Sequence, residues 1–189
     1  MSISKALEHL GAEVAVTADG DVIKGSDGAV LPGVGAFYDA MRQIEHLRDI
    51  IGGLEDRPLL GICLGLQLLF TESEEGGRNP GLDVIRGRVV RFGGDVKVPH
   101  MGWNSVHIRR DTPLFKGIRD GSYFYFVHSY YAIPEEDVTA ATTPYGVEFP
   151  SVVVKDNVFA TQFHPEKSGA AGLQLLRNYL DVVVNSKSI

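Results

Sequence analysis

Hydrophobic and polar residues follow two different patterns in the two halves of the chain. In the first half, short apolar strand-like runs alternate with helix-like runs, which predicts a parallel sheet with helices on both faces. The second half is rich in short strands with tight turns, which predicts an antiparallel extension of the sheet. The expected helices cover residues 2–10, 36–54, 64–70 and 169–184. The expected strands cover residues 13–17, 28–31, 59–62, 84–92, 103–108, 123–127, 138–142, 151–155 and 158–163.

Length, charge and cysteine content exclude several classes of protein. The chain has 189 residues, which predicts a single domain over residues 1–189 with a substantial core. Its net charge of −6 and lack of a basic cluster disfavour nucleic acids and anionic membranes as partners. No apolar run approaches the roughly 20 residues of a membrane span, and no signal peptide is visible. The single cysteine cannot form an intrachain disulfide. We therefore expect a cytoplasmic protein. The acidic, glycine-rich residues 72–81 are expected to form a surface loop.

That single cysteine, Cys63, lies in the sequence Gly-Ile-Cys-Leu-Gly, between a strand-like run and a helix-like run. A nucleophile at a sharp strand-to-helix turn needs small neighbours, and glycines stand two residues before and two after it. The turn also offers the backbone N–H of Leu64 to a developing oxyanion. A small buried cysteine at a tight turn would fit the same five residues.

A second segment favours catalysis. His164 follows the last predicted strand, Pro165 ends that strand because it cannot donate to a sheet, and Glu166 comes next. A histidine at the end of a strand with an acid nearby has the elements of a general base and its orienting group. A surface histidine beside a surface acid is the alternative. The nucleophile at residue 63 favours the catalytic interpretation, because it needs such a base.

These segments resemble the class I (triad) glutamine amidotransferases. The matching stretches are Gly-Ile-Cys-Leu-Gly-Leu-Gln from residue 61, Gln-Phe-His-Pro-Glu-Lys-Ser-Gly from residue 162 and Pro-Gly-Val-Gly-Ala-Phe from residue 32. The resemblance implies an α/β, flavodoxin-like three-layer fold with a mostly parallel central sheet. It implies that a Cys63–His164–Glu166 triad hydrolyses glutamine, without a metal or another cofactor.

The resemblance also implies roles for residues around the triad. The oxyanion would be held by N–H groups of Leu64 and of the loop Gly33, Val34 and Gly35, where a peptide flip would switch the site on. Glycines on both sides of Val34 lower the cost of such a flip. The substrate-binding residues implied are Gln67, His128, Ser129 and Tyr130. There is a simpler alternative for each role. The glycines of the loop would be required for steric reasons alone, and Gln67 would face the solvent.

One branch of this family matches further. Val-Pro-His-Met-Gly-Trp-Asn from residue 98 and Phe-Val-His-Ser-Tyr from residue 126 resemble the glutaminase subunits of imidazole glycerol phosphate synthase, in histidine biosynthesis. That resemblance implies a heterodimer in which ammonia passes to a cyclase subunit with a (β/α)₈ barrel. It makes one stretch an interface loop over the ammonia exit: Pro99, His100, Met101, Gly102, Trp103 and Asn104. The alternative is a loop packed onto the core.

Other functions remain open at this level. The chain could serve another synthase, such as anthranilate or aminodeoxychorismate synthase, although those lack the Pro-His-Met-Gly-Trp-Asn stretch. A stand-alone cysteine hydrolase or peptidase would use the same triad. A non-catalytic binding module is also possible, but the presence of Cys63, His164 and Glu166 argues against it. One departure is visible: relatives open with a strand and an Asp-Tyr-Gly-x-Gly-Asn-like loop, whereas residues 1–7 here begin within the first helix. We therefore expect the sheet to lack that strand.

Overall fold

The computed structural model describes residues 2–54 and 57–186. The helices are α1 (Ile3–His9), α2 (Gly20–Gly25), α3 (Phe37–Ile44), α4 (Arg48–Gly52), α5 (Leu64–Leu68) and α6 (Gly169–Ser186), with 3-10 turns η1 (Glu45–Leu47), η2 (Pro113–Phe115) and η3 (Pro165–Lys167). The strands are β1 (Ala29–Gly33), β2 (Leu59–Cys63), β3 (Phe70–Ser73), β4 (Asn79–Pro80), β5 (Ile85–Arg91), β6 (His100–Ile108), β7 (Ser122–His128), β8 (Tyr130–Pro134), β9 (Thr139–Tyr145), β10 (Val147–Lys155) and β11 (Val158–Thr161).

The strands form a seven-stranded sheet and a four-stranded sheet. The larger sheet has the order β1-β2-β11-β10-β9-β6-β7 and the smaller one β4-β3-β5-β8. In the larger sheet, β2 pairs in parallel with both β1 and β11, and the remaining pairs are antiparallel. The predicted α/β class with an antiparallel second half is confirmed. Within the larger sheet the parallel part is confined to these three strands, so it is smaller than the sequence pattern indicates, and in the smaller sheet β3 and β5 also pair in parallel.

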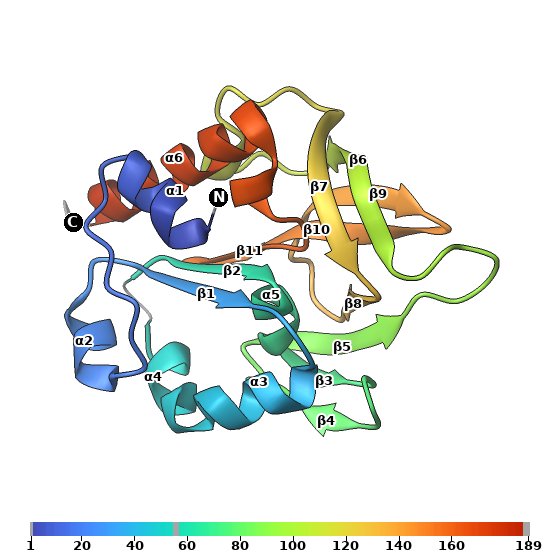
Figure 1. Cartoon of the computed structure of the whole chain (residues 1–189), viewed down its shortest axis with the longest axis horizontal. Coiled ribbons are helices and arrows are strands. Elements are labelled where there is room, and N and C mark those ends of the chain that lie inside the picture. Colours follow the sequence, from blue (N-terminus) through green and yellow to red (C-terminus); the bar gives the residue numbers. More distant parts are fainter. Residues whose placement is uncertain (1, 55–56, 187–189) are drawn as a thin grey trace.

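Helices cover both faces of the parallel strands, as Figure 1 shows: α1 and α6 lie on one face, and α2, α3 and α4 lie on the other. Strand β2 is buried throughout and divides the core, because successive side chains of a strand point to opposite faces. Leu60 and Ile62 pack in a cluster with residues of α1 and α6, whereas Leu59 packs with residues of α3. Across the described residues, no helix combines the length and the apolar character needed to cross a membrane.

Four element predictions are wrong. Residues 13–17 are not a strand: β1 lies at the edge of the sheet, and no described strand pairs with its other side or with these residues. The helix expected over residues 36–54 is divided into α3, η1 and α4, a bend that buries both Leu47 and Ile51. Residues 72–81 are not only loop, since β3 and β4 pair across a turn. The stretch from His100 to Asn104 is not a loop but the first half of β6.

Candidate active site

Cys63 stands on a sharp turn between β2 and α5. Its backbone has φ 55° and ψ −107°, a conformation that costs an L residue on the order of 1–3 kcal/mol and is found mainly at functional sites. A side chain at Gly65 would collide with the Leu31 carbonyl, and one at Gly61 would come within 3.0 Å of Leu69. The predicted turn is therefore confirmed; Gly65 is required by a clash with backbone, whereas Gly61 lies in a crowded position where a side chain would press on its neighbours.

The turn places the thiol among backbone and amide groups at the carboxyl end of β2. The side chain of Cys63 is largely buried, and its Sγ lies 3.7 Å from the Val127 carbonyl oxygen of β7. On another side, Nε2 of Gln162 lies 3.8 Å from the same Sγ. Gln162 is fully buried, and the sequence alone assigns it no role. It follows β11 directly, and only the pairing of β11 with β2 brings it to Cys63, so no local sequence signal identifies it.

His164 and Glu166 meet in the same place. Nδ1 of His164 lies 2.9 Å from Oε1 of Glu166, and both side chains are buried. The His164 backbone is held against β7, because its N–H donates to the Tyr125 carbonyl and its own carbonyl accepts from the Ser168 hydroxyl. Since Nδ1 faces the carboxylate, Nε2 is the ring nitrogen left for the thiol. The sequence-predicted triad residues are therefore brought together.

Electrostatics favour a charged imidazole in this arrangement. Burial alone would lower the pKa of His164, but hydrogen bonds and charges from Cys63 and Glu166 outweigh burial and raise it to about 9. The proton is therefore held on the ring at neutral pH. A positively charged imidazole beside the sulfur is what a cysteine nucleophile needs, because the thiolate is the reactive form.

This pKa gives a direct prediction. The folded protein binds the His164 proton more tightly than an unfolded chain with an ordinary pKa of 6.5. The resulting stabilisation is fully present below pH 6.5 and is lost as the pH rises through about 9. In Cys63→Ala the pKa of His164 should fall, because the thiol is one of the groups that raise it. An NMR titration of the His164 ring measures this, and an unchanged pKa would show that Glu166 alone sets it.

The predicted oxyanion loop joins β1 to α3 beside the nucleophile. A side chain at Gly33 would lie 2.8 Å from Cβ of Leu64, so the loop passes close to the first residue of α5. Val34 is 85% exposed, and Gly35 has φ 95°. The peptide groups around Val34 are therefore held by little side-chain packing. The N–H of Leu64, at the start of α5, has no partner within its own helix.

Three of the predicted substrate-binding residues, Gln67, His128 and Tyr130, meet in one group of hydrogen bonds at the Tyr130 carbonyl. Nε2 of Gln67 donates to the Tyr130 carbonyl at 3.0 Å and to Oε1 of Gln162 at 3.2 Å. His128 is buried and bonds the same carbonyl through Nδ1 at 2.8 Å. The carbonyl of Ser129 accepts from the N–H of Phe92. Gln67 is therefore not the solvent-facing residue of the alternative interpretation.

Comparison with known proteins gives this site its context. The family model of glutamine amidotransferase class-I matches residues 1–182. The chain belongs to this family. It is thus a glutamine-hydrolysing enzyme of class I. Among curated relatives, an imidazole glycerol phosphate synthase subunit HisH of Archaeoglobus fulgidus is 52% identical, over 96% of this chain and 92% of the relative. The subunit of the same name from Thermococcus kodakarensis is 58% identical, over 87% of each chain.

Solved structures support the amidotransferase fold. A putative GMP synthase subunit from Thermoplasma acidophilum superimposes with a TM-score of 0.75 at 21% identity, covering 97% of this chain and 87% of that one. The glutaminase domain of Trypanosoma brucei CTPS, with bound acivicin, gives a TM-score of 0.69 at 16% identity, covering 98% and 87%. At these identities the similarity concerns the fold.

Strand β6 of this amidotransferase has one buried and one exposed face. His100 is almost fully buried, and the side chain of Asn104 bonds inward to it. Met101 and Trp103, on the opposite face, are 62% and 55% exposed. Pro99 precedes the strand, and Gly102, with φ 132°, lies between the two exposed residues. Trp103 of the predicted interface stretch is therefore exposed, whereas His100 does not lie on the surface.

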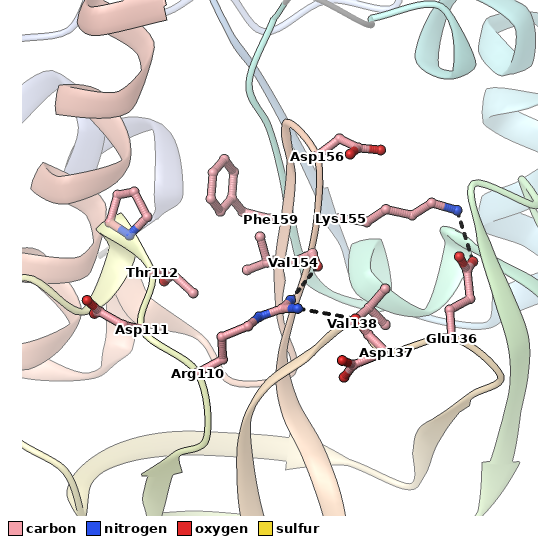
Figure 2. Close-up of a pocket in the computed structure, with 11 residues that line it drawn as sticks. Arg110, Asp111, Thr112, Glu136, Asp137, Val138, Val154, Lys155, Asp156 and Phe159 are labelled. Carbon is pink, nitrogen blue, oxygen red and sulfur yellow. Dashed lines mark hydrogen bonds and ion pairs between the residues drawn. The ribbon is translucent and has the colours of Figure 1, made fainter.

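A wide hollow of about 590 Å³ has none of the triad residues in its lining, and Figure 2 draws the residues that line it. It surrounds the turn between β10 and β11, at the end of β11 opposite to His164, because Val158 pairs with Leu59 at the start of β2. Its cations already have partners: Arg110 donates to two backbone carbonyls, and Lys155 pairs with Glu136 at 2.9 Å. The hollow therefore does not belong to the site of glutamine hydrolysis.

Proposed function

We propose that this chain is the glutaminase subunit of an imidazole glycerol phosphate synthase in histidine biosynthesis. It hydrolyses glutamine to glutamate and ammonia, and passes the ammonia to a (β/α)₈ cyclase subunit. The observation that carries the proposal is the cysteine on the strained turn beside the buried His164–Glu166 pair, in a chain that is 50–58% identical to HisH subunits over most of its length. The relatives named above are subunits of that one enzyme, which favours it over other synthases.

The chemistry follows from the positions of the three residues. The sulfur of Cys63 attacks the side-chain amide carbon of glutamine, and the negative charge that develops on the amide oxygen is stabilised by the N–H groups of Leu64 and Val34. His164 already holds the proton that the thiol has given up and hands it to the departing ammonia, while Glu166 holds the imidazole in place. Water then opens the thioester through the same base to release glutamate.

An exposed apolar surface beside the triad supports the partner part of the proposal. Met101 and Trp103 of β6 lie opposite Val127 and Tyr125 of β7, and the ring centroids of Trp103 and Tyr125 are 6.2 Å apart. Tyr123 at the next outward position of β7 is also exposed. Aromatic residues and methionine are enriched in the centres of protein interfaces. This apolar face lies on the strand that holds the His164 backbone, so ammonia released there has a short route to a partner.

Reconstitution tests the function. The chain is combined with a (β/α)₈ cyclase subunit, glutamine and the phosphoribulosyl-formimino carboxamide nucleotide, and both imidazole glycerol phosphate and aminoimidazole carboxamide ribonucleotide are measured. We expect both products in equal amounts, with one glutamate released for each pair. Glutamine hydrolysis without any product from the cyclase would contradict this partner and favour a stand-alone hydrolase.

The apolar face gives a second prediction. Trp103→Ala should weaken binding of the cyclase by about 1 kcal/mol or more, as truncation of a buried aromatic anchor commonly does. Val147→Ala, at another exposed apolar residue on a different strand, is the control and should leave binding unchanged. Titration calorimetry gives both dissociation constants. Equal constants for Trp103→Ala and the unmodified chain would exclude Trp103 from the interface.

A further inference from the structure

Two buried histidines connect β6 to the residues around the nucleophile. Nδ1 of His128 lies 2.8 Å from the Tyr130 carbonyl oxygen, which can only accept, so Nδ1 carries the hydrogen. Burial lowers the pKa of His128 to about 3 and that of His100 to about 4, so both rings are neutral at pH 7. Nε2 of His128 therefore accepts, and the hydrogen in its 2.9 Å contact with Nδ1 of His100 belongs to His100.

The other end of the pair is fixed in the same way. Nε2 of His100 must then accept, and it lies 3.2 Å from Nδ2 of Asn104. The same Nδ2 donates to the Pro144 carbonyl at 2.9 Å, while Oδ1 of Asn104 accepts from the N–H of Ser105. The contacts with Pro144 and Ser105 thus both require the nitrogen and oxygen of the Asn104 amide to be placed as they are here, with Nδ2 facing His100. One tautomer of each histidine satisfies every hydrogen bond from Asn104 to Tyr130.

The Tyr130 carbonyl continues the connection toward the thiol. It accepts from Gln67 as well as from His128, and Gln67 donates its second hydrogen to Gln162, whose Nε2 faces Sγ of Cys63. Buried hydrogen bonds of this kind orient the groups that they join, because an unpaired buried polar group is costly. A continuous hydrogen-bonded path therefore runs from Asn104 to the nucleophile.

The path begins behind the apolar face. His100 and Asn104 occupy inward positions of β6. Met101 and Trp103, which lie between them in the strand, occupy outward positions. Since neighbouring residues of a strand share one backbone, a shift of β6 caused by contact on its outer face also moves the first members of the path. The side chains of His100 and His128 pack among Phe92, Phe126 and Phe149, which leaves them little freedom to move independently.

We propose that His128, oriented by His100, is a positioning residue of the glutaminase reaction that sets Gln67 and Gln162 against Cys63 and ties this arrangement to the position of β6. Neither histidine touches the sulfur in this role. His128 acts by donating one hydrogen bond to the Tyr130 carbonyl, and His100 acts by fixing the tautomer that makes this donation possible. The link to the partner rests on the proposed function, whereas the positioning of the thiol does not.

Two variants of His128 separate positioning from packing. His128→Asn keeps a donor near the position of Nδ1, whereas His128→Phe fills the space without a donor. In glutamine hydrolysis, His128→Phe should lose about tenfold in kcat/KM and His128→Asn should stay within about threefold of the unmodified chain, since one buried hydrogen bond differs between them. Equal rates for all three folded proteins, or equal losses in both variants, would overturn the proposal.

Two further measurements test the proposal without the His128→Phe variant, in case that variant does not fold. Nitrogen NMR of the unmodified chain should show His128 with hydrogen on Nδ1 and His100 with hydrogen on Nδ1, and the opposite tautomer in either ring would overturn the proposal. His100→Phe removes the donor to His128 and the acceptor for Asn104, whereas His100→Asn keeps a donor near Nδ1. The stimulation of hydrolysis by the cyclase should fall about tenfold in His100→Phe and about threefold or less in His100→Asn.

The test of the proposed partner and the tests of the two histidines can fail independently. If the unmodified chain hydrolyses glutamine but is not stimulated by the cyclase, the proposed partner is wrong, and the comparison of the two His128 variants still decides the positioning role. If stimulation is normal in the unmodified chain and unchanged in His100→Phe, the connection between β6 and the thiol is wrong while the proposed function stands.

Discussion

Cys63→Ala should lose glutamine hydrolysis almost completely, by roughly the 10⁶-fold that removal of a nucleophile costs a hydrolase with a triad. The large effect is expected because the remaining groups have no atom that can form the thioester. The loop donors and His164 would still bind and polarise the amide, but they would do so for a much weaker water nucleophile. Release of glutamate from glutamine, followed in the complex with the cyclase, measures the loss.

The same variant provides its own control. Added ammonium salts should restore synthesis by the cyclase, because the proposed function places the cyclase reaction in the partner, where it needs only ammonia. Cys63→Ser keeps the shape of the side chain and replaces the thiol by a hydroxyl, so it separates the reactivity of sulfur from packing. Substantial glutaminase activity in Cys63→Ala would remove Cys63 from the role of nucleophile.

Val34→Pro should abolish the stimulation of glutamine hydrolysis by the cyclase. One oxyanion donor contributes on the order of a hundred- to a thousand-fold in rate, so a loop that supplies this donor only when the partner is bound should give stimulation of at least about a hundredfold. Val34 is exposed and lies between glycines, so a flip of its peptide group would disturb no packed side chain at this loop residue. Proline at this position has no N–H to offer.

Val34→Ala is the matched control, because it shortens the same exposed side chain and keeps the N–H. It should retain most of the stimulation. Initial rates of glutamate release, with and without the cyclase and its nucleotide, give the ratio for each protein. Full activity of the isolated unmodified chain would contradict a partner-controlled donor, and strong stimulation of Val34→Pro would assign the donor to another peptide group.

The nucleophile turn could be predicted from sequence because its requirements are local. Gly61 and Gly65 are close enough in sequence to Cys63 for the steric demand of the turn to be visible in five residues. The His164–Glu166 contact is local as well. The role of Gln162 could not be predicted, because it depends on the pairing of β11 with β2 and on contacts with Gln67 from another element.

Strand β6 shows that local composition can predict the wrong secondary structure. The stretch from His100 to Asn104 contains glycine and follows a proline, a composition typical of loops. It is nevertheless a strand, because β7 pairs with it in register from His100 opposite His128 onward. Conversely, residues 13–17 have the apolar alternation of a strand, but no strand among the described residues pairs with them. Strand pairing joins distant parts of the chain, so local pattern predicts it less well than helices and turns.

The position of β11 has a consequence for synthesis on the ribosome. The strand that carries the nucleophile at its end is completed early, at Cys63, but one of its two neighbours is β11, which begins at Val158. A domain folds as a unit once its sequence has emerged, and contacts of large sequence separation form late. The proposed general base, His164, comes just after β11, so it meets Cys63 only when nearly the whole chain has left the exit tunnel. A nascent chain that ends before His164 thus carries the thiol without its proposed general base.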